Sequence, residues 1–233
     1  SLEQQSIIQF RRFSSEYRVW QGSDFDIEAA VDEIKSELGD FSLATVLSQR
    51  QTIDPIVVRR HSIQTGSLRY LQVQFYDQQS AEVAKADGKP QFPLVKSVEE
   101  EERKKEPALI CYLAEGKEDV AYFTDKSQKD DESSDVLGVC PLGPQLRQAI
   151  TEALALERIQ NQYPDLAQDP VALTELRTRL AAAQYAEENL IASILDKPEN
   201  SQWFWRGQKL SARGQAVKNR RQFQSALSQA SET

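Results

Sequence analysis

Residues 108–140, ALICYLAEGKEDVAYFTDKSQKDDESSDVLGVC, decide the class of fold. Two short apolar runs, ALICYLA at 108–114 and DVLGVC at 135–140, have the length and composition of buried strands. The polar stretch between them predicts a short helix over about 117–128. Because strands that alternate with helices are typical of an α/β fold, this stretch predicts that class.

The residues before this stretch predict further strands and two helices. Residues 7–21 alternate β-branched or aromatic residues with charged ones around a Ser-Ser turn, which indicates a hairpin. Apolar spacing over 25–38 predicts a helix with one buried face, and a second, short helix opens at Ser42. From Pro55 the pattern returns to strands, and one strand has an apolar face made of Leu71, Val73 and Phe75.

The last third of the chain predicts a long antiparallel helical hairpin. The first helix ends near Tyr163, because a helical residue is disfavoured before Pro164, and Asp169 caps the second. In the second helix apolar residues recur at spacings of three and four over three heptads, as in a coiled coil, and only Glu187 interrupts the stripe. Packing inside the chain and docking of a protein partner both explain such a stripe. Its candidate partner-binding residues are Leu173, Leu176, Leu180, Leu190 and Ile194.

These patterns divide the chain into four segments. A hairpin plus helices, similar to part of a winged helix, spans 1–54; a small α/β sheet domain spans 55–142 and contains an acidic insertion at 77–106; the helical hairpin spans 143–197; an aromatic and basic tail spans 198–233. The predicted fold class is therefore α/β, with a small mixed sheet and flanking helices followed by a long antiparallel helical hairpin.

Composition narrows the class of protein. The 233 residues begin at Ser1 and include no methionine, which we interpret as a sign of an internal segment of a longer protein. A hydrophobic content of 39% suffices for a core, and no apolar run is long enough to cross a membrane. Two cysteines within apolar runs, Cys111 and Cys140, predict buried thiols rather than a disulfide. We therefore expect a cytoplasmic protein without a membrane partner.

Charge is unevenly distributed along the chain, whose net charge is -8. Residues 77–135 hold 16 acidic and 9 basic residues, whereas residues 198–233 hold 6 basic and 2 acidic ones. An acidic middle thus precedes a basic tail. Such asymmetry indicates either a nucleic-acid contact or two solvated faces that meet different neighbours.

The sequence carries no recognisable catalytic motif. Neither a phosphate-binding loop of the form G-x-x-x-x-G-K-[ST] nor a G-x-G-x-x-G after a strand is present. His61 is the only histidine, which argues against a His/Cys metal cluster and against a Ser-His-Asp triad. Asp24 and Asp26 precede a helix, where capping explains them better than metal binding. We predict no catalytic residue, no metal and no cofactor, and hence no enzyme activity in this chain.

Basic clusters are the candidates for nucleic-acid binding, because the guanidinium group forms paired hydrogen bonds with phosphate. The overall acidity opposes this interpretation, and solvated faces also explain the clusters. We expect the aromatic run at 203–205 to pack in a core rather than to stack on bases, and the tail from about residue 208 to form a helix. The candidate nucleic-acid-binding residues are Arg59, Arg60, Arg69, Arg206, Lys209, Arg213, Lys218, Arg220 and Arg221, and Arg11, Arg12 and Arg18 form a further cluster on the first hairpin.

Four stretches carry a resemblance to a known family: FRRFSSEYRVWQGSDFDIEAAV at 10–31, PIVVRRHSIQTGSLRY at 55–70, ALERIQNQYPDLAQDPVALTELRTRLAAA at 155–183 and WFWRG at 203–207. They resemble the middle region of very large bacterial ATPases of phage defence, similar to the BREX-type large ATPase. The resemblance implies that the nucleotide-binding domain lies upstream, and that the YRVWQGSDFD stretch is a winged-helix hairpin. It supplies no active-site residue.

Together these observations predict a non-catalytic coupling and protein-interaction module of a larger ATPase. Its partners would be another protein or other domains of the parent protein, contacted through the helical hairpin. The alternative is a nucleic-acid-binding module that uses the basic tail and the arginine-bearing hairpins. A stand-alone hydrolase or nuclease would need Asp24, Asp26 and His61 to converge.

Overall fold

A computed structural model describes residues 8–11, 16–19, 25–51, 53–58, 70–81, 107–163, 166, 169–212 and 214–230. The predictions made for Asp24, His61, Arg12, Arg59, Arg60, Arg69, Arg213 and the insertion beyond residue 81 lie outside these residues. The chain forms two compact units. Ser1–Asp40 and Gln148–Asn189 make the helical unit, and Phe41–Arg147 and Leu190–Thr233 make the sheet unit.

A six-stranded mixed sheet is the centre of the sheet unit. Its order is β3 (Ile56–Val57), β4 (Tyr70–Tyr76), β5 (Ala108–Leu113), β6 (Val136–Cys140), β7 (Gln202–Trp205) and β8 (Gln208–Lys209). β4, β5 and β6 are parallel to one another, and the remaining neighbours pair antiparallel. A separate hairpin joins β9 (Ser211–Ala212) to β10 (Gln215–Ala216). The predicted α/β class with a small mixed sheet is therefore confirmed.

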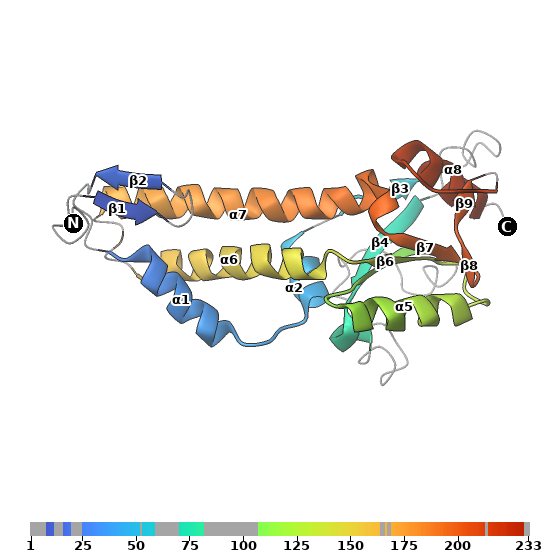
Figure 1. The fold of residues 1–233 in the computed structure, drawn as a ribbon, viewed down its shortest axis with the longest axis horizontal. Helices are drawn as coiled ribbons and strands as arrows, with labels where there is room; N and C mark the ends of the chain where they lie inside the picture. Colours follow the sequence, from blue (N-terminus) through green and yellow to red (C-terminus); the bar gives the residue numbers. More distant parts are fainter. Residues whose placement is uncertain are drawn as a thin grey trace. The chain divides into compact units, whose positions relative to one another are not determined.

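Helices cover both faces of this sheet (Figure 1). On one face α5 (Lys117–Lys129) stacks Phe123 on Tyr112 of β5, with ring centroids 4.6 Å apart. On the other, α8 (Arg220–Ala230) places Phe223 4.4 Å from the Trp203 ring. The Trp203 ring lies over Gly138, where the Cβ of any other residue would overlap it. Burial of Trp203 and Phe204 confirms that the aromatic run packs as core.

Several local predictions for the sheet unit are confirmed. The α2 helix (Leu43–Arg50) begins after Ser42, whose hydroxyl accepts the Thr45 N–H. Cys111 and Cys140 are both buried free thiols. The tail differs from its prediction, because Gln208–Lys209, Ser211–Ala212 and Gln215–Ala216 are short strands and, among the described residues after 208, Arg220–Ala230 alone are helical. A short 3-10 turn at Pro198–Asn200 leads into β7.

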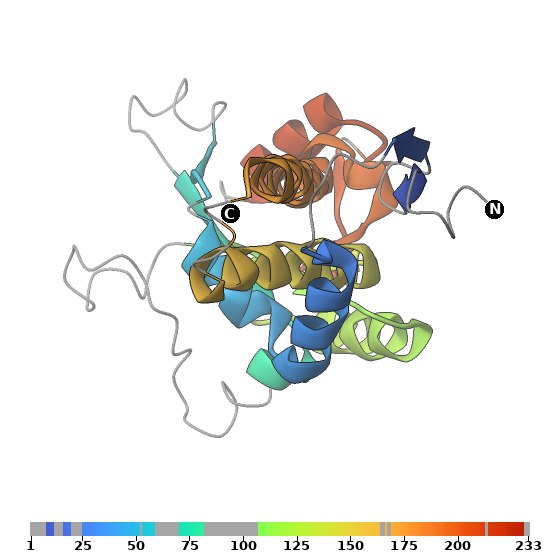
Figure 2. The same cartoon turned by 90° about the vertical axis from the view of Figure 1, so that its left-hand side faces the viewer.

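Three helices pack together in the helical unit: α1 (Ile27–Leu38), α6 (Gly143–Gln162) and α7 (Pro170–Asp196). Figures 1 and 2 both show α1 beside α6, and their shared core includes Ile34, Leu156 and Leu176. As predicted, Asp26 caps α1 and a helical hairpin spans α6 and α7. The predicted first hairpin is also present, as β1 (Ile8–Arg11) paired antiparallel with β2 (Glu16–Val19).

The two units divide the chain differently from the four consecutive segments that the sequence predicts. The beginning of the chain packs with the middle of the helical hairpin, and the C-terminal tail completes the sheet. Both α6 and α7 contribute residues to the helical unit and to the sheet unit.

A charged side chain occupies the centre of the helical unit. Arg179 of α7 is only 5% exposed, and its guanidinium donates to Glu28 of α1 and Glu152 of α6 at 2.6 Å each. Glu152 also pairs with Lys35. Burial favours a raised pKa of Glu152, but its hydrogen bonds with Lys35 and Arg179 outweigh burial and lower that pKa. One guanidinium thus joins all three helices.

Removing this guanidinium should destabilise the protein. In Arg179→Met two carboxylates lose their buried cation, so we expect the free energy of unfolding to fall by about 3 kcal/mol. Arg158→Met is the matched control, because Arg158 pairs with Glu37 where both side chains are more than a third exposed. Its effect should stay below about 1 kcal/mol. Equal losses in urea unfolding of the two variants would contradict a central role for Arg179.

Candidate functional site

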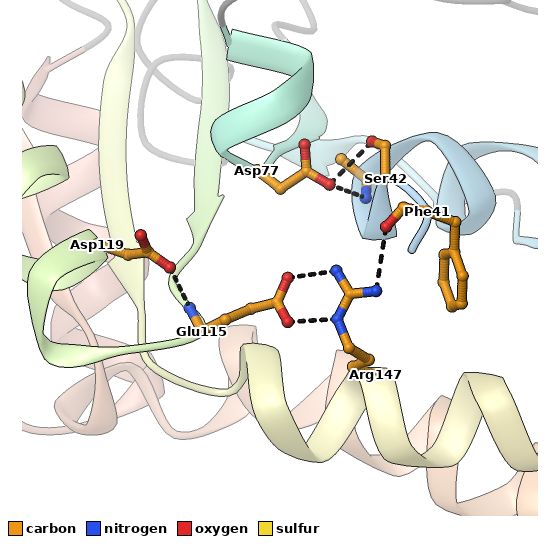
Figure 3. Close-up of polar contacts among 7 residues, drawn as sticks. Phe41, Ser42, Asp77, Glu115, Asp119 and Arg147 are labelled. Carbon is orange, nitrogen blue, oxygen red and sulfur yellow. Dashed lines mark hydrogen bonds and ion pairs between the residues drawn. The ribbon is translucent and has the colours of Figure 1, made fainter. Parts of the chain in front are cut away.

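The carboxyl ends of the parallel strands are where open α/β sheets usually bind ligands. Asp77 directly follows β4, Glu115 comes two residues after β5, and α6 begins three residues after β6. Asp119 lies in the first turn of α5 and accepts the Glu115 N–H at 2.9 Å. Charged side chains therefore gather at this edge of the sheet (Figure 3).

Asp77 is 3% exposed and fully hydrogen-bonded. One carboxylate oxygen accepts the Ser42 hydroxyl at 2.8 Å and the Ala44 N–H at 3.1 Å, and the other accepts the Ser80 N–H at 2.8 Å. Burial alone would raise the pKa of Asp77, but the hydrogen bonds from Ser80, Ala44 and Ser42 outweigh it and lower the pKa. Asp77 thus holds the first turn of α2 at the end of β4.

Arg147 makes the second connection at this edge. Its guanidinium binds the Glu115 carboxylate through two nitrogens, with the Nη2 to Oε1 distance at 2.5 Å. Its remaining nitrogen, Nη1, donates to the Phe41 carbonyl oxygen at 3.1 Å, and the guanidinium carbon lies 4.9 Å from the centre of the Phe41 ring. As Figure 3 shows, Arg147 joins α6 to the end of β5 and to the residue before the α2 cap.

These contacts give the edge a structural role. The carboxylate oxygens of Asp77 and Glu115 accept hydrogen bonds from residues at α2 and in α6. The chain's own helices therefore occupy the position where many α/β proteins bind a ligand. Among the described residues no group of three or more His, Cys, Asp or Glu side chains could hold a metal ion. Sequence reasoning missed Asp77, Glu115 and Arg147, although a charge directly after a buried strand is a usable signal.

The basic tail reaches the surface at several places. Arg206 lies in the two-residue turn between β7 and β8, with φ 47°, and Gly207 follows with φ 71°, as a type I′ turn requires. The Arg206 guanidinium lies 4.7 Å from the centre of the Trp205 ring. Exposed cations of the tail in the described residues are Arg206, Lys209, Lys218, Arg220 and Arg221. Arg220 forms an exposed ion pair with Asp196 at 2.7 Å.

The candidate partner-binding residues on α7 face inward. Leu176 and Ile194 are buried, Leu173 and Leu180 pack against the core of the helical unit, and Leu190 is half-buried. Leu173, Leu176 and Leu180 pack within the chain because α1 and α6 need an apolar neighbour. Docking of a partner on this stripe would therefore require α7 to separate from its own core.

Asp77 supports a prediction about stability and pH. In Asp77→Asn the amide nitrogen would face the Ala44 N–H or Ser80 N–H, so we expect a loss of about 1–2 kcal/mol at neutral pH. Because the folded pKa is lowered, Asp77 stabilises the fold above an aspartate's ordinary pKa of about 3.9, and the difference between variant and parent shrinks as the pH falls below that value.

Asp125→Asn is the control for this measurement, because Asp125 is 63% exposed in an i,i+4 pair with Lys129. We expect it to change the free energy of unfolding by less than about 0.5 kcal/mol. Urea unfolding at pH 7 and at pH 3 measures both variants. A difference for Asp77→Asn that stays constant over this range would contradict the assignment.

Comparisons with known proteins find no relative of this chain. No protein-family model, no curated protein and no solved structure matches it. Among the described helices, none combines the length and apolar character that crossing a membrane requires.

Proposed function

We propose that the chain is a non-catalytic coupling and protein-interaction module of a larger ATPase. The observation that supports this is the division of α6 and α7 between two compact units. α6 belongs to the sheet unit up to Arg147 and to the helical unit from Gln148, and α7 passes from the helical unit to the sheet unit between Asn189 and Leu190. Two unbroken helices thus provide a continuous path between the units.

Helices are suited to this role because they resist bending and extension. With a rise of about 1.5 Å per residue, α6 and α7 are about 30 and 40 Å long. Arg179 fixes α7 to α1 and α6 in one unit, while Arg147 fixes the start of α6 in the other. A displacement of either unit would strain the ion pairs of Arg179 and Arg147. Packed elements transmit movement through such contacts.

The parent protein is the part of this proposal that comes from resemblance. Large ATPases of phage defence supply nucleotide hydrolysis in a domain that this chain would not contain. In that setting the partners are other domains of the parent or a separate protein, and the location is the cytoplasm. The module would pass nucleotide-dependent movement onward.

Coupling can be measured by weakening α6 and α7 at the residues where each helix passes from one unit to the other. Gln148→Gly and Asn189→Gly change exposed residues at the unit boundary, and each lowers helix stability by about 1 kcal/mol. In the chain without the glycine substitutions, we expect Arg179→Met to accelerate hydrogen–deuterium exchange in β6 by about 5-fold or more. In a chain that carries both Gln148→Gly and Asn189→Gly, Arg179→Met should accelerate exchange in β6 much less.

Gln160→Gly with Ala181→Gly is the matched control, because both are exposed helical positions within the helical unit. This pair should leave the response of β6 to Arg179→Met intact. If Arg179→Met leaves exchange in β6 unchanged in the chain without glycine substitutions, the two units are independent and the coupling proposal is wrong.

Nucleic-acid binding is a second candidate function, favoured by the placement of the tail cations. Lys218, Arg220 and Arg221 surround the start of α8, whose first turn contains no acidic residue. Cations at this positive end of a helix dipole disfavour the helix by about 0.3–1 kcal/mol each. The exposed ion pair of Arg220 with Asp196 contributes at most about 1 kcal/mol, so the binding of phosphate groups is a further reason for the position of these cations.

This candidate predicts salt-sensitive binding of DNA or RNA. For about four phosphate contacts, affinity should fall roughly 100-fold between about 50 and 200 mM salt. Arg220→Glu with Arg221→Glu should abolish the binding in fluorescence anisotropy titrations. Lys117→Glu with Arg177→Glu changes the net charge equally at exposed residues outside the tail and should weaken it far less. Equal losses in the two variants would mean that only net charge matters.

A further inference from the structure

Helix α7 exposes one face of the helical unit to solvent. The helix buries Leu176 and Ala183 in the core that it shares with α1 and α6, and the residues on its opposite side are exposed. Between residues 178 and 186 the exposed positions carry no charged side chain, although 27% of the chain is Asp, Glu, Lys or Arg. The outer face of α7 is the surface made by Arg177, Thr178, Ala181, Gln184, Tyr185 and Glu188.

An exposed aromatic side chain stands on this outer face. Tyr185 is 68% exposed, the largest fraction among the exposed large hydrophobic side chains that the structure describes. Ala181 lies one turn earlier on the same side of the helix and is also exposed, so a ring from another molecule can pack on it at short range. Since tyrosine is among the residues that contribute most energy to protein interfaces, Tyr185 is the natural anchor of a contact here.

Opposite charges flank Ala181 and Tyr185 on the outer face. Arg177 and Glu188 are about three helical turns apart, so both lie on the same side of α7. Neither has a charged residue three or four positions away on the helix, so ion pairs within α7 do not explain them. Among the described residues no ion pair joins either of them to another side chain. The face therefore presents a cation at one end and an anion at the other.

We infer that the outer face of α7 is the interface of a symmetric dimer, in which the α7 helices of two copies run antiparallel. A two-fold axis brings Arg177 of each copy to Glu188 of the other, and each Tyr185 packs on Ala181 of the second copy. A different protein would have to supply complementary charges, whereas a second copy has them at the required spacing. Arg179 lies on the opposite side of α7, so the dimer does not depend on the coupling role.

Sedimentation equilibrium of the full chain measures this association. Because the contact is short, we expect a weak, reversible dimer whose population grows between about 10 and 500 μM protein. Tyr185→Ser removes the anchor and should raise the dissociation constant by about 10-fold or more. Tyr122→Ser is the matched control, since Tyr122 is an exposed tyrosine on another helix, α5. It should change the dissociation constant by less than about 2-fold.

Exchange of the two flanking charges tests the antiparallel symmetry. Arg177→Glu alone places two carboxylates at each end of the interface, and Glu188→Arg alone places two cations there, so each should weaken the dimer by about 5-fold or more. The double variant Arg177→Glu/Glu188→Arg restores opposite charges and should return the dissociation constant to within about 3-fold of that of the unmodified chain. An equal mixture of the two single variants should form a dimer that contains one chain of each.

Three results would overturn the inference. They are a chain that stays monomeric up to about 500 μM, equal weakening of the dimer by Tyr185→Ser and Tyr122→Ser, and a double charge variant that does not recover the affinity lost by the single variants. All substituted positions are exposed, so unfolding of the variants does not complicate these measurements. None of the three results bears on exchange in β6, so the dimer can fail while the coupling role stands.

Discussion

Strand β6 is buried at all five of its residues, and most of the sheet unit follows from the need to cover it. Parallel β5 and antiparallel β7 occupy its two edges. Phe123 of α5 contributes to the cover of one face, and on the other Gly138 leaves room for the Trp203 ring, against which Phe223 packs. Segments that precede the helical hairpin in the sequence and segments that follow it must therefore come together before β6 is buried.

Buried and half-buried polar side chains hold the remaining elements in place. A buried charge is expensive without a partner, so each one specifies where its partner must lie. Arg179 joins three helices, Arg147 joins α6 to Glu115 and Phe41, and Asp77 fixes the start of α2. The contacts that these three side chains make between elements explain why charged residues stand at these positions. The cations of the tail are exposed, and contacts such as the Arg220–Asp196 ion pair contribute little to stability, which is why the nucleic-acid candidate concerns that surface.

Local patterns predicted much of the secondary structure. Apolar periodicity predicted α1, α5 and the two long helices, and the short side chains of Asp26 and Ser42 predicted two caps. The prediction of a helix from about residue 208 was wrong. The type I′ turn at Arg206-Gly207 and the pairing of β7 with β6 override a weak helical preference there. The candidate site was predicted least well. Ion pairs such as Glu115 with Arg147 join residues far apart in the sequence.

The sequence by itself determined the α/β class, the helical hairpin, the burial of both cysteines and the aromatic core, because each depends on the order of apolar and polar residues within one element. Only the tertiary structure decided which segments share a unit, that the α7 stripe packs inward, and that the outer face of α7 is exposed. These features depend on contacts between distant segments. Such contacts form only when the whole chain buries its apolar surface, and local periodicity contains no information about partners.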